Sequence, residues 1–166
     1  YDEAKKISKL KKVKKVSPNY KVYLDLMESV PQMNANFVWG LDANLNYCAQ
    51  SGEDCLTGKG VTIAIIDSGV DYTHLDLGGC SVTGNINDGS CDKVIAGWDF
   101  FNNDADPMDD NGHGTNVAGI AAGNGKLKGV APDAKIVVYK VLDALSDGTA
   151  DDVIEAIEKS TDPNSD

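Results

Sequence analysis

The 166-residue sequence contains no arginine, so lysine alone supplies its fixed positive charge. The net charge at pH 7 is −11, and this excess of negative charge argues against nucleic acid as the main partner. The sequence also lacks an apolar run long enough to cross a membrane as a helix. We therefore expect neither nucleic acid nor a membrane among its partners.

An initiator methionine and an apolar signal core are absent too, because the sequence opens at Tyr1 and continues into a lysine-rich stretch. We expect that it begins inside a longer product. The apolar fraction of 42% is enough for one folded domain with a sizeable core and gives no indication of wholesale disorder.

The charge is divided unevenly along the chain. Residues 1–26 carry eight lysines and three acidic residues, a net charge of +5. Residues 27–166 carry seven lysines and 23 acidic residues, a net charge of −16. This division predicts a basic head and an acidic body that attract each other. Within the head, residues 4–15 have the spacing of an amphipathic helix or a short basic strand, and Tyr20–Leu26 alternates as a strand does.

The four cysteines fall in two close pairs, Cys48 with Cys55 and Cys80 with Cys91. Neither pair has the two-residue spacing of a zinc knuckle, and both lie in stretches typical of surface loops. We interpret them as two local disulfides, which implies an oxidising compartment and favours a secreted or extracellular protein. The alternative is four reduced thiols, which cysteine spacing alone leaves open.

The most informative apolar stretch is Val61–Ile66, which ends at Asp67 and is bounded by Gly60 and Gly69. A run of this length predicts a strand buried on both faces in the centre of a parallel sheet. Ligands of such sheets bind at the carboxyl ends of the strands, so Asp67 stands where a reacting group is wanted. Alternatively, Asp67 is an ordinary turn or helix-capping aspartate, which is common at strand ends.

Strand and helix patterns alternate along the body, and this alternation predicts an α/β fold with a layered sheet. Thr149 and Asp152 have the spacing of a capping box that opens the last helix. Further strands are expected at Lys93–Phe100 and Lys135–Leu142, and helices at Asn36–Leu41, His113–Gly123 and Thr149–Ser160.

His113 lies between Gly112 and Gly114, at the junction of a loop and a predicted helix. The glycines permit a close backbone approach on both sides of the ring. The positive end of the helix dipole disfavours the imidazolium, so we expect it to keep His113 neutral, as a general base must be. Asp67 is the candidate carboxylate that stabilises the imidazolium formed on proton transfer. Without such a partner, His113 is equally consistent with a structural histidine or a metal ligand.

Four segments of the body, in order along the chain, resemble one known family. Ile66–Asp71, followed by Tyr72–Leu77, resembles the aspartate motif of the subtilisin-like serine proteases, and Gly112–Gly119 resembles their histidine motif. Gly129–Pro132 and Tyr139–Leu142 match two further landmarks of the family. The resemblance implies a subtilisin-like three-layer α/β fold with a central parallel sheet, here truncated. Aspartate before histidine is also the chain order of subtilisin.

The resemblance implies a serine endopeptidase that hydrolyses peptide bonds in proteins through an Asp-His-Ser triad. It gives Asp67 the role of orienting the histidine and His113 the role of activating the serine. The motifs for the nucleophilic serine and the oxyanion-hole asparagine lie beyond Asp166 in the family, so we expect these 166 residues alone to be inactive. The alternative is a non-catalytic binding or inhibitory protein on the same scaffold.

Substrate binding is implied by the same resemblance. The segment of Gly148, Thr149 and Ala150 lies where the family presents an edge strand to the backbone of a protein or peptide substrate. The main side-chain pocket of the family is built mostly from segments outside this sequence, so the resemblance carries no substrate preference.

The basic head resembles a further part of the family. Val16–Asn19 with Tyr20–Leu26 resembles the end of a subtilisin-type propeptide, and Ser29–Gln32 resembles the start of a mature enzyme. The resemblance implies that residues 1–27 are the C-terminal part of a small α+β propeptide and that residues 28–166 are the N-terminal part of the catalytic domain. In the family, the propeptide assists folding and places its tail in the substrate cleft.

The implied chemistry needs no cofactor, because side chains supply all three groups of the triad. The family's structural calcium is a candidate, but Ile120–Lys128 is shorter than the family's calcium-binding loop. Asp76 and Glu28 fall near matching ligand positions, and carboxylates suit calcium. An acidic loop offers further carboxylates, although a solvated loop is the commoner explanation, and we predict no metal site: the loop holds Asp104, Asp106, Asp109 and Asp110.

Overall fold

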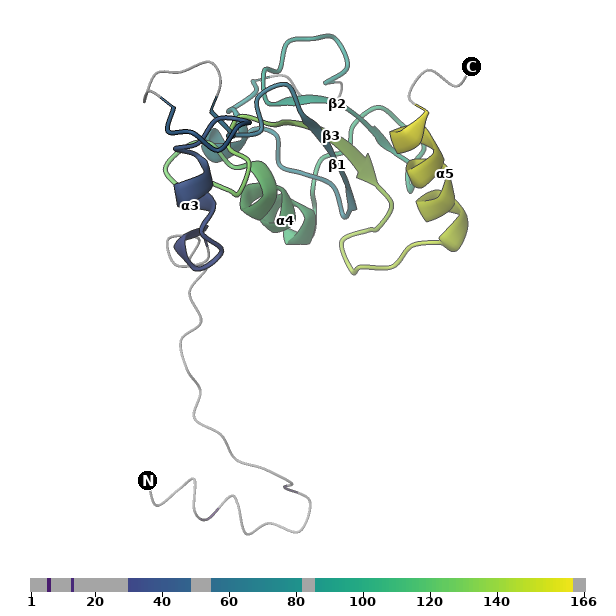
Figure 1. The fold of residues 1–166 in the computed structure, drawn as a ribbon. Helices are drawn as coiled ribbons and strands as arrows, with labels where there is room; N and C mark the ends of the chain where they lie inside the picture. Colours follow the sequence, from purple (N-terminus) through teal and green to yellow (C-terminus); the bar gives the residue numbers. More distant parts are fainter. Residues whose placement is uncertain (1–5, 7–12, 14–29, 49–54, 82–85, 163–166) are drawn as a thin grey trace.

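The computed structural model describes residues 6, 13, 30–48, 55–81 and 86–162 (Figure 1). The predicted propeptide, including the strand Tyr20–Leu26, lies outside these residues apart from Lys6 and Val13. The elements in chain order are α3 (Ala35–Val38), β1 (Thr62–Asp67), the short 3-10 helix η1 (Leu75–Leu77), β2 (Val94–Asp99), α4 (His113–Ala122), β3 (Lys135–Lys140) and α5 (Ala150–Thr161).

The three strands form one parallel sheet in the order β1-β3-β2. Asp67 at the end of β1 and Asp99 at the end of β2 both pair with Lys140 at the end of β3. The carboxyl ends of the strands therefore lie level at one edge of the sheet. Asp67 stands at this edge, as the apolar run of its strand predicts.

Side chains of β3 alternate between two buried clusters on opposite faces of the sheet. Ile136 and Val138 share one cluster with Ala118 of α4, and all three are fully buried. Tyr139 shares the other cluster with Ala156 of α5. Successive strand residues point to opposite faces, so α4 and α5 cover different faces of the sheet. The predicted three-layer α/β arrangement is confirmed.

Within the described residues, the first strand has a paired neighbour on one side only. β1 lies at an edge and pairs only with β3, which is the central strand. Thr62 and Ala64 of β1 are exposed, whereas Ile65 is buried. A continuous apolar run is typical of central strands, but pairing on one side and packing under α4 already account for the burial that β1 has.

The helices begin and end close to the predicted residues. The hydroxyl of Thr149 caps α5 by accepting the N–H of Asp152 at 3.2 Å and donating to its carboxylate at 2.7 Å, which confirms the cap. The first helix is shorter than Asn36–Leu41, because α3 ends at Val38. None of the described helices combines the length and the apolar character that a membrane span requires.

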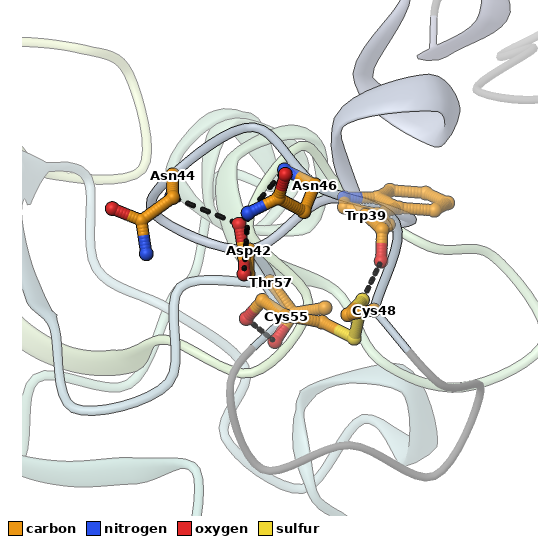
Figure 2. The surroundings of a disulfide bond; sticks show 7 residues. All are labelled: Trp39, Asp42, Asn44, Asn46, Cys48, Cys55 and Thr57. Atoms are coloured by element: carbon orange, nitrogen blue, oxygen red, sulfur yellow. Dashed lines mark hydrogen bonds between the residues drawn. A yellow bond between two sulfur atoms is a disulfide. The ribbon is translucent and has the colours of Figure 1, made fainter.

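Both predicted disulfides are present, with Cα atoms 5.7 Å apart for Cys48–Cys55 and 5.3 Å apart for Cys80–Cys91. Figure 2 shows Cys48–Cys55 beside a turn in which Asp42 accepts hydrogen bonds from the residues that follow it. Cys91 is 4% exposed and belongs to the core cluster on the α4 side. The second disulfide therefore ties its loop directly to the core.

Candidate active site

Asp67 and His113 come together although 46 residues separate them. Asp67 is the last residue of β1, and His113 is the first residue of α4. His113 Nδ1 lies 2.8 Å from Oδ1 of Asp67 and 3.0 Å from Oδ2. The fold thus forms the predicted pair at the carboxyl edge of the sheet.

The partners of Asp67 determine which nitrogen of His113 carries a proton. A carboxylate only accepts hydrogen bonds, so Nδ1 is the protonated nitrogen of the ring. The backbone N–H of Ser68 also donates to Oδ1 of Asp67, at 2.7 Å. The His113 side chain is 67% exposed and that of Asp67 only 13%. Nε2 is therefore the ring nitrogen that remains for a reacting group.

The pKa of His113 is raised above its ordinary value. The hydrogen bond to Asp67 is the largest cause, followed by the negative charge of Asp67, while slight desolvation acts in the opposite direction and the charge of Asp109 adds to the rise. The contact with Asp67 therefore acts against the expected effect of the helix terminus, which favours the neutral ring. A carboxylate in direct contact favours the charged form of the ring.

The two glycines beside His113 have different functions. A Cβ atom at Gly114 would lie 2.0 Å from the carbonyl oxygen of Gly69 and 3.1 Å from Cβ of Asp67, so only glycine lets α4 start this close to β1. A Cβ at Gly112 would meet nothing within 4 Å, but its φ of 97° lies in the left-handed region that favours glycine. The expected close approach is confirmed at Gly114 and wrong at Gly112.

Behind the pair lie polar contacts that sequence reasoning missed, and we call Ser68, Asp109 and Thr115 the Asp109 network. The fully buried Ser68 donates its hydroxyl to Oδ1 of Asp109 at 2.9 Å and accepts the N–H of Gly114 at 3.0 Å. Thr115 donates its N–H and its hydroxyl to Oδ2 of Asp109. In the sequence, Asp109 is one of four similar aspartates in an acidic loop, so no pattern distinguishes it.

Comparison with known proteins places this site in a family. The sequence model of the subtilase family matches residues 58–166, which include both Asp67 and His113. The chain belongs to the subtilase family. The family match confirms the resemblance recognised in the sequence, and curated relatives that this subtilase matches are named as serine proteases.

Individual relatives of this subtilase match it over different lengths. It is 35% identical to the minor extracellular protease Vpr of Bacillus subtilis (strain 168) over 191 aligned residues, covering 99% of this chain and 21% of Vpr. It is 42% identical to thermitase of Thermoactinomyces vulgaris over 100 residues, covering 58% of this chain and 31% of thermitase. The chain thus spans about a fifth to a third of these relatives.

A solved structure supports the fold of the subtilase independently. The crystal structure of a cold-adapted subtilisin-like serine proteinase matches with a TM-score of 0.51 and 36% sequence identity. The match covers 75% of this chain and 42% of that chain. The subtilisin-like fold class is therefore shown for this part of the protein.

A buried lysine connects the loops around the site of this subtilase, and although Lys140 lies within the landmark Tyr139–Leu142, no role was predicted for it from the sequence. Lys140 is 1% exposed, and its Nζ donates to the carbonyl oxygens of Ser68 and Leu142 and to Oδ1 of Asp110, each at 2.7 Å. A buried ammonium needs such a complete set of acceptors. Lys140 thereby ties the residue after Asp67 to the loop that leads to His113.

The predicted substrate segment does not form a strand in the described chain. Ala150 is the first residue of α5, and Thr149 is its N-cap, with the extended angles φ −114° and ψ 155°. Gly148 packs so closely on the chain after β3 that a Cβ there would lie 2.2 Å from the carbonyl oxygen of Val141. Val141 in turn donates its N–H to the carbonyl of Asp67, so Gly148 packs against a residue that is bonded to the end of β1.

The acidic residues considered as calcium ligands are engaged by protein donors. Asp76 accepts one backbone N–H on each carboxylate oxygen, from Lys126 at 2.7 Å and from Leu127 at 3.3 Å. Glu28 lies outside the described residues, and among the residues that the structure describes no three acidic, histidine or cysteine side chains gather as a metal site would require. In the acidic loop, Asp104 accepts from Asp106, Asp106 from Tyr72, Asp109 from its network and Asp110 from Lys140.

Proposed function

We propose that the full-length protein is a serine endopeptidase in which His113 is the general base and Asp67 orients it. The observation that carries this proposal is the 2.8 Å contact between Nδ1 of His113 and Asp67, in a chain of a protease family. Because Nδ1 is bound to Asp67, proton transfer falls to Nε2 of the exposed ring. The nucleophilic serine comes from a part of the protein outside these 166 residues.

In this mechanism, the serine oxygen attacks the carbonyl carbon of a peptide bond while its proton passes to Nε2 of His113. Asp67 stabilises the imidazolium that results, and the proton then goes to the leaving amine. Water releases the acyl group by the same route in reverse. All the groups that move protons are side chains, so the chemistry requires no cofactor.

The partners in this proposal are protein or peptide substrates and the protein's own basic head. We propose that Gly148, Thr149 and Ala150 face the substrate backbone, since Gly148 packs on Val141, whose N–H donates to the carbonyl of Asp67. Residues 1–27 are proposed to be the end of a propeptide and residues 28–166 the start of the catalytic domain. The opposite charges of head and body favour docking of the head in the substrate cleft.

We also propose that the protein is secreted. Two disulfides within the described residues suit an oxidising compartment, and the relative Vpr is named an extracellular protease. No membrane or nucleic-acid partner is part of this proposal, and the net charge of −11 opposes the latter.

The test is labelling of the full-length protein with a fluorophosphonate, which reacts with activated serines, together with hydrolysis of a peptide substrate. His113→Ala should abolish both, because the serine then has no base. His74→Ala, at the other histidine of the sequence, is the matched control and should keep both. Absence of labelling in the wild-type protein would favour the binding or inhibitory alternative. Residues 1–166 alone should remain unlabelled.

A further inference from the structure

Asp109 accepts more hydrogen bonds than an ordinary turn aspartate. Its Oδ1 accepts the N–H groups of Asn111 at 3.0 Å and Gly112 at 2.9 Å, besides the hydroxyl of Ser68. Its Oδ2 accepts the N–H and the hydroxyl of Thr115. Contacts to the next few residues are typical of a turn, but the bond to Ser68 spans 41 residues and reaches the strand end beside Asp67.

The hydroxyl of Ser68 joins the two halves of the site. Ser68 follows Asp67 directly, and the N–H that it accepts belongs to Gly114, which follows His113 directly. Ser68 and Gly114 are both buried, so water cannot replace this bond if it is lost. Leaving a buried N–H without a partner is unfavourable, so this bond keeps Ser68 and Gly114 at a defined spacing.

A second connection runs through Thr115. Its hydroxyl donates to Asp109 and at the same time accepts the N–H of Asp71 at 2.8 Å. The first turn of α4 is thereby held to the loop after β1 as well as to its own preceding loop. The hydroxyls of Ser68 and Thr115 thus each connect the end of β1 to the start of α4. Both hydroxyls also donate to the carboxylate of Asp109.

We propose that Asp109, acting through the hydroxyls of Ser68 and Thr115, is the positioning residue that holds His113 against Asp67. The effect of Asp109 on catalysis rests on the proposed function, but its effect on the contact between Asp67 and His113 does not. Asp109 touches neither ring nor substrate in this mechanism. It fixes the two backbone segments that carry the reacting pair.

The ionised state of Asp109 is what the network requires. Burial favours the neutral acid, but hydrogen bonds from Thr115, Gly112 and Asn111 outweigh it and hold the pKa of Asp109 below its ordinary value. Five donors point at two oxygens, and a protonated or amidated side chain would have to direct a hydrogen at one of them. Asp109→Asn therefore breaks the network without removing its volume.

The variants separate the effect of a misplaced His113 ring from the effect of a lost negative charge at Asp109. Thr115→Val keeps the shape and the net charge of the protein but removes the shared hydroxyl, whereas Thr115→Ser keeps that hydroxyl. Asp109→Asn changes charge and geometry together. Asp42→Asn is the matched control, because Asp42 also accepts two backbone N–H groups, in the turn beside the Cys48–Cys55 disulfide (Figure 2).

The first readout is the titration of the His113 ring in the full-length protein by NMR, with its resonance identified by loss in His113→Gln. A well-held contact with Asp67 keeps the pKa of His113 raised. We expect this pKa to fall toward the ordinary value in Thr115→Val and Asp109→Asn, and to stay at the wild-type value in Thr115→Ser and Asp42→Asn. Circular dichroism confirms that each variant is folded.

The second readout is the kinetics of peptide hydrolysis. In Thr115→Val we expect kcat to fall by about 10- to 100-fold with little change in KM, because the reacting groups are misplaced while the substrate still binds. A wild-type titration and a wild-type kcat in folded Thr115→Val would overturn the proposal. If the wild-type protein hydrolyses nothing, the proposed function fails, but the His113 titration still decides the positioning role.

Discussion

At the scale of single residues, the protonation of His113 sets the pH at which the site can act. Its raised pKa means that the imidazolium persists to a higher pH than the ordinary value of about 6.5. A general base must be neutral, so activity should rise as the pH passes through this raised value. Stability follows the opposite course. The contribution of the charged pair is complete below about pH 6.5 and is lost as the pH rises through the folded-state pKa.

Asp67→Asn tests the role of the carboxylate directly. The amide removes the largest causes of the raised pKa of His113, so this pKa should fall. The amide can also hold the imidazole in the wrong tautomer, and we expect kcat to fall by about 10⁴-fold. NMR titration of His113 and peptide hydrolysis by the full-length protein measure the two effects. Near-wild-type turnover in a folded Asp67→Asn protein would remove Asp67 from the mechanism.

The sequence allowed the contact between Asp67 and His113 to be predicted, but not the polar contacts behind it. Asp67 follows an apolar strand and His113 lies between glycines, so local patterns mark both. Asp109 resembles its acidic neighbours, and Lys140 resembles any lysine at a strand end. Their importance comes from contacts with Ser68 that span 41 and 72 residues, and no local pattern contains such contacts.

At the scale of elements, the site depends on the close approach of α4 to β1. Gly114→Ala places a methyl group where only 2.0 Å separates it from the carbonyl oxygen of Gly69. We expect it to lower the free energy of unfolding by about 1–3 kcal/mol and to weaken the contact between Asp67 and His113. Chemical denaturation and the His113 titration of the full-length protein measure these changes.

Gly119→Ala is the matched control, because it lies in the same helix and its Cβ would meet nothing within 4 Å. There the better helix propensity of alanine should leave stability unchanged or raise it by up to about 1 kcal/mol. If Gly114→Ala is as harmless as Gly119→Ala, the approach of α4 to β1 is not limited by the glycine.

Strands and helices could be predicted because their hydrophobic residues repeat with different periods. The place of each strand in the sheet was harder to predict. The strand and helix predictions for residues 61–66, 93–100, 113–123, 135–142 and 149–160 all correspond to observed elements. The run Val61–Ile66 suggested a central strand, yet β1 is an edge strand in the described chain. Periodicity reports burial of side chains, and it contains no information about which backbone edges are paired.

At the scale of the whole molecule, the fold and the candidate site belong to the acidic body. The family match begins at residue 58, and the sheet, α4 and α5 all lie within it. The three layers were predictable because strands and helices alternate in the sequence. The division between residues 1–27 and 28–166 remains a prediction, since the structure describes only Lys6 and Val13 of the head.

The two disulfides should contribute unequally to the stability of the whole molecule. They close similar loops, with sequence separations of 11 for Cys80–Cys91 and 7 for Cys48–Cys55, so chain entropy alone gives each about 2.5–3 kcal/mol. The two disulfides differ in burial, because Cys91 lies in the core cluster whereas Cys48 and Cys55 are only half-buried.

We therefore expect replacement of Cys80 and Cys91 by alanine to lower the free energy of unfolding by about 3–5 kcal/mol. The same replacement of Cys48 and Cys55 should lower it by about 2–3 kcal/mol. Chemical denaturation of the full-length protein under oxidising conditions measures both, and reductant should destabilise each variant through its remaining disulfide. An equal or reversed order would mean that the Cys80–Cys91 bond restrains only its own loop, and that the core cluster holds its shape without it.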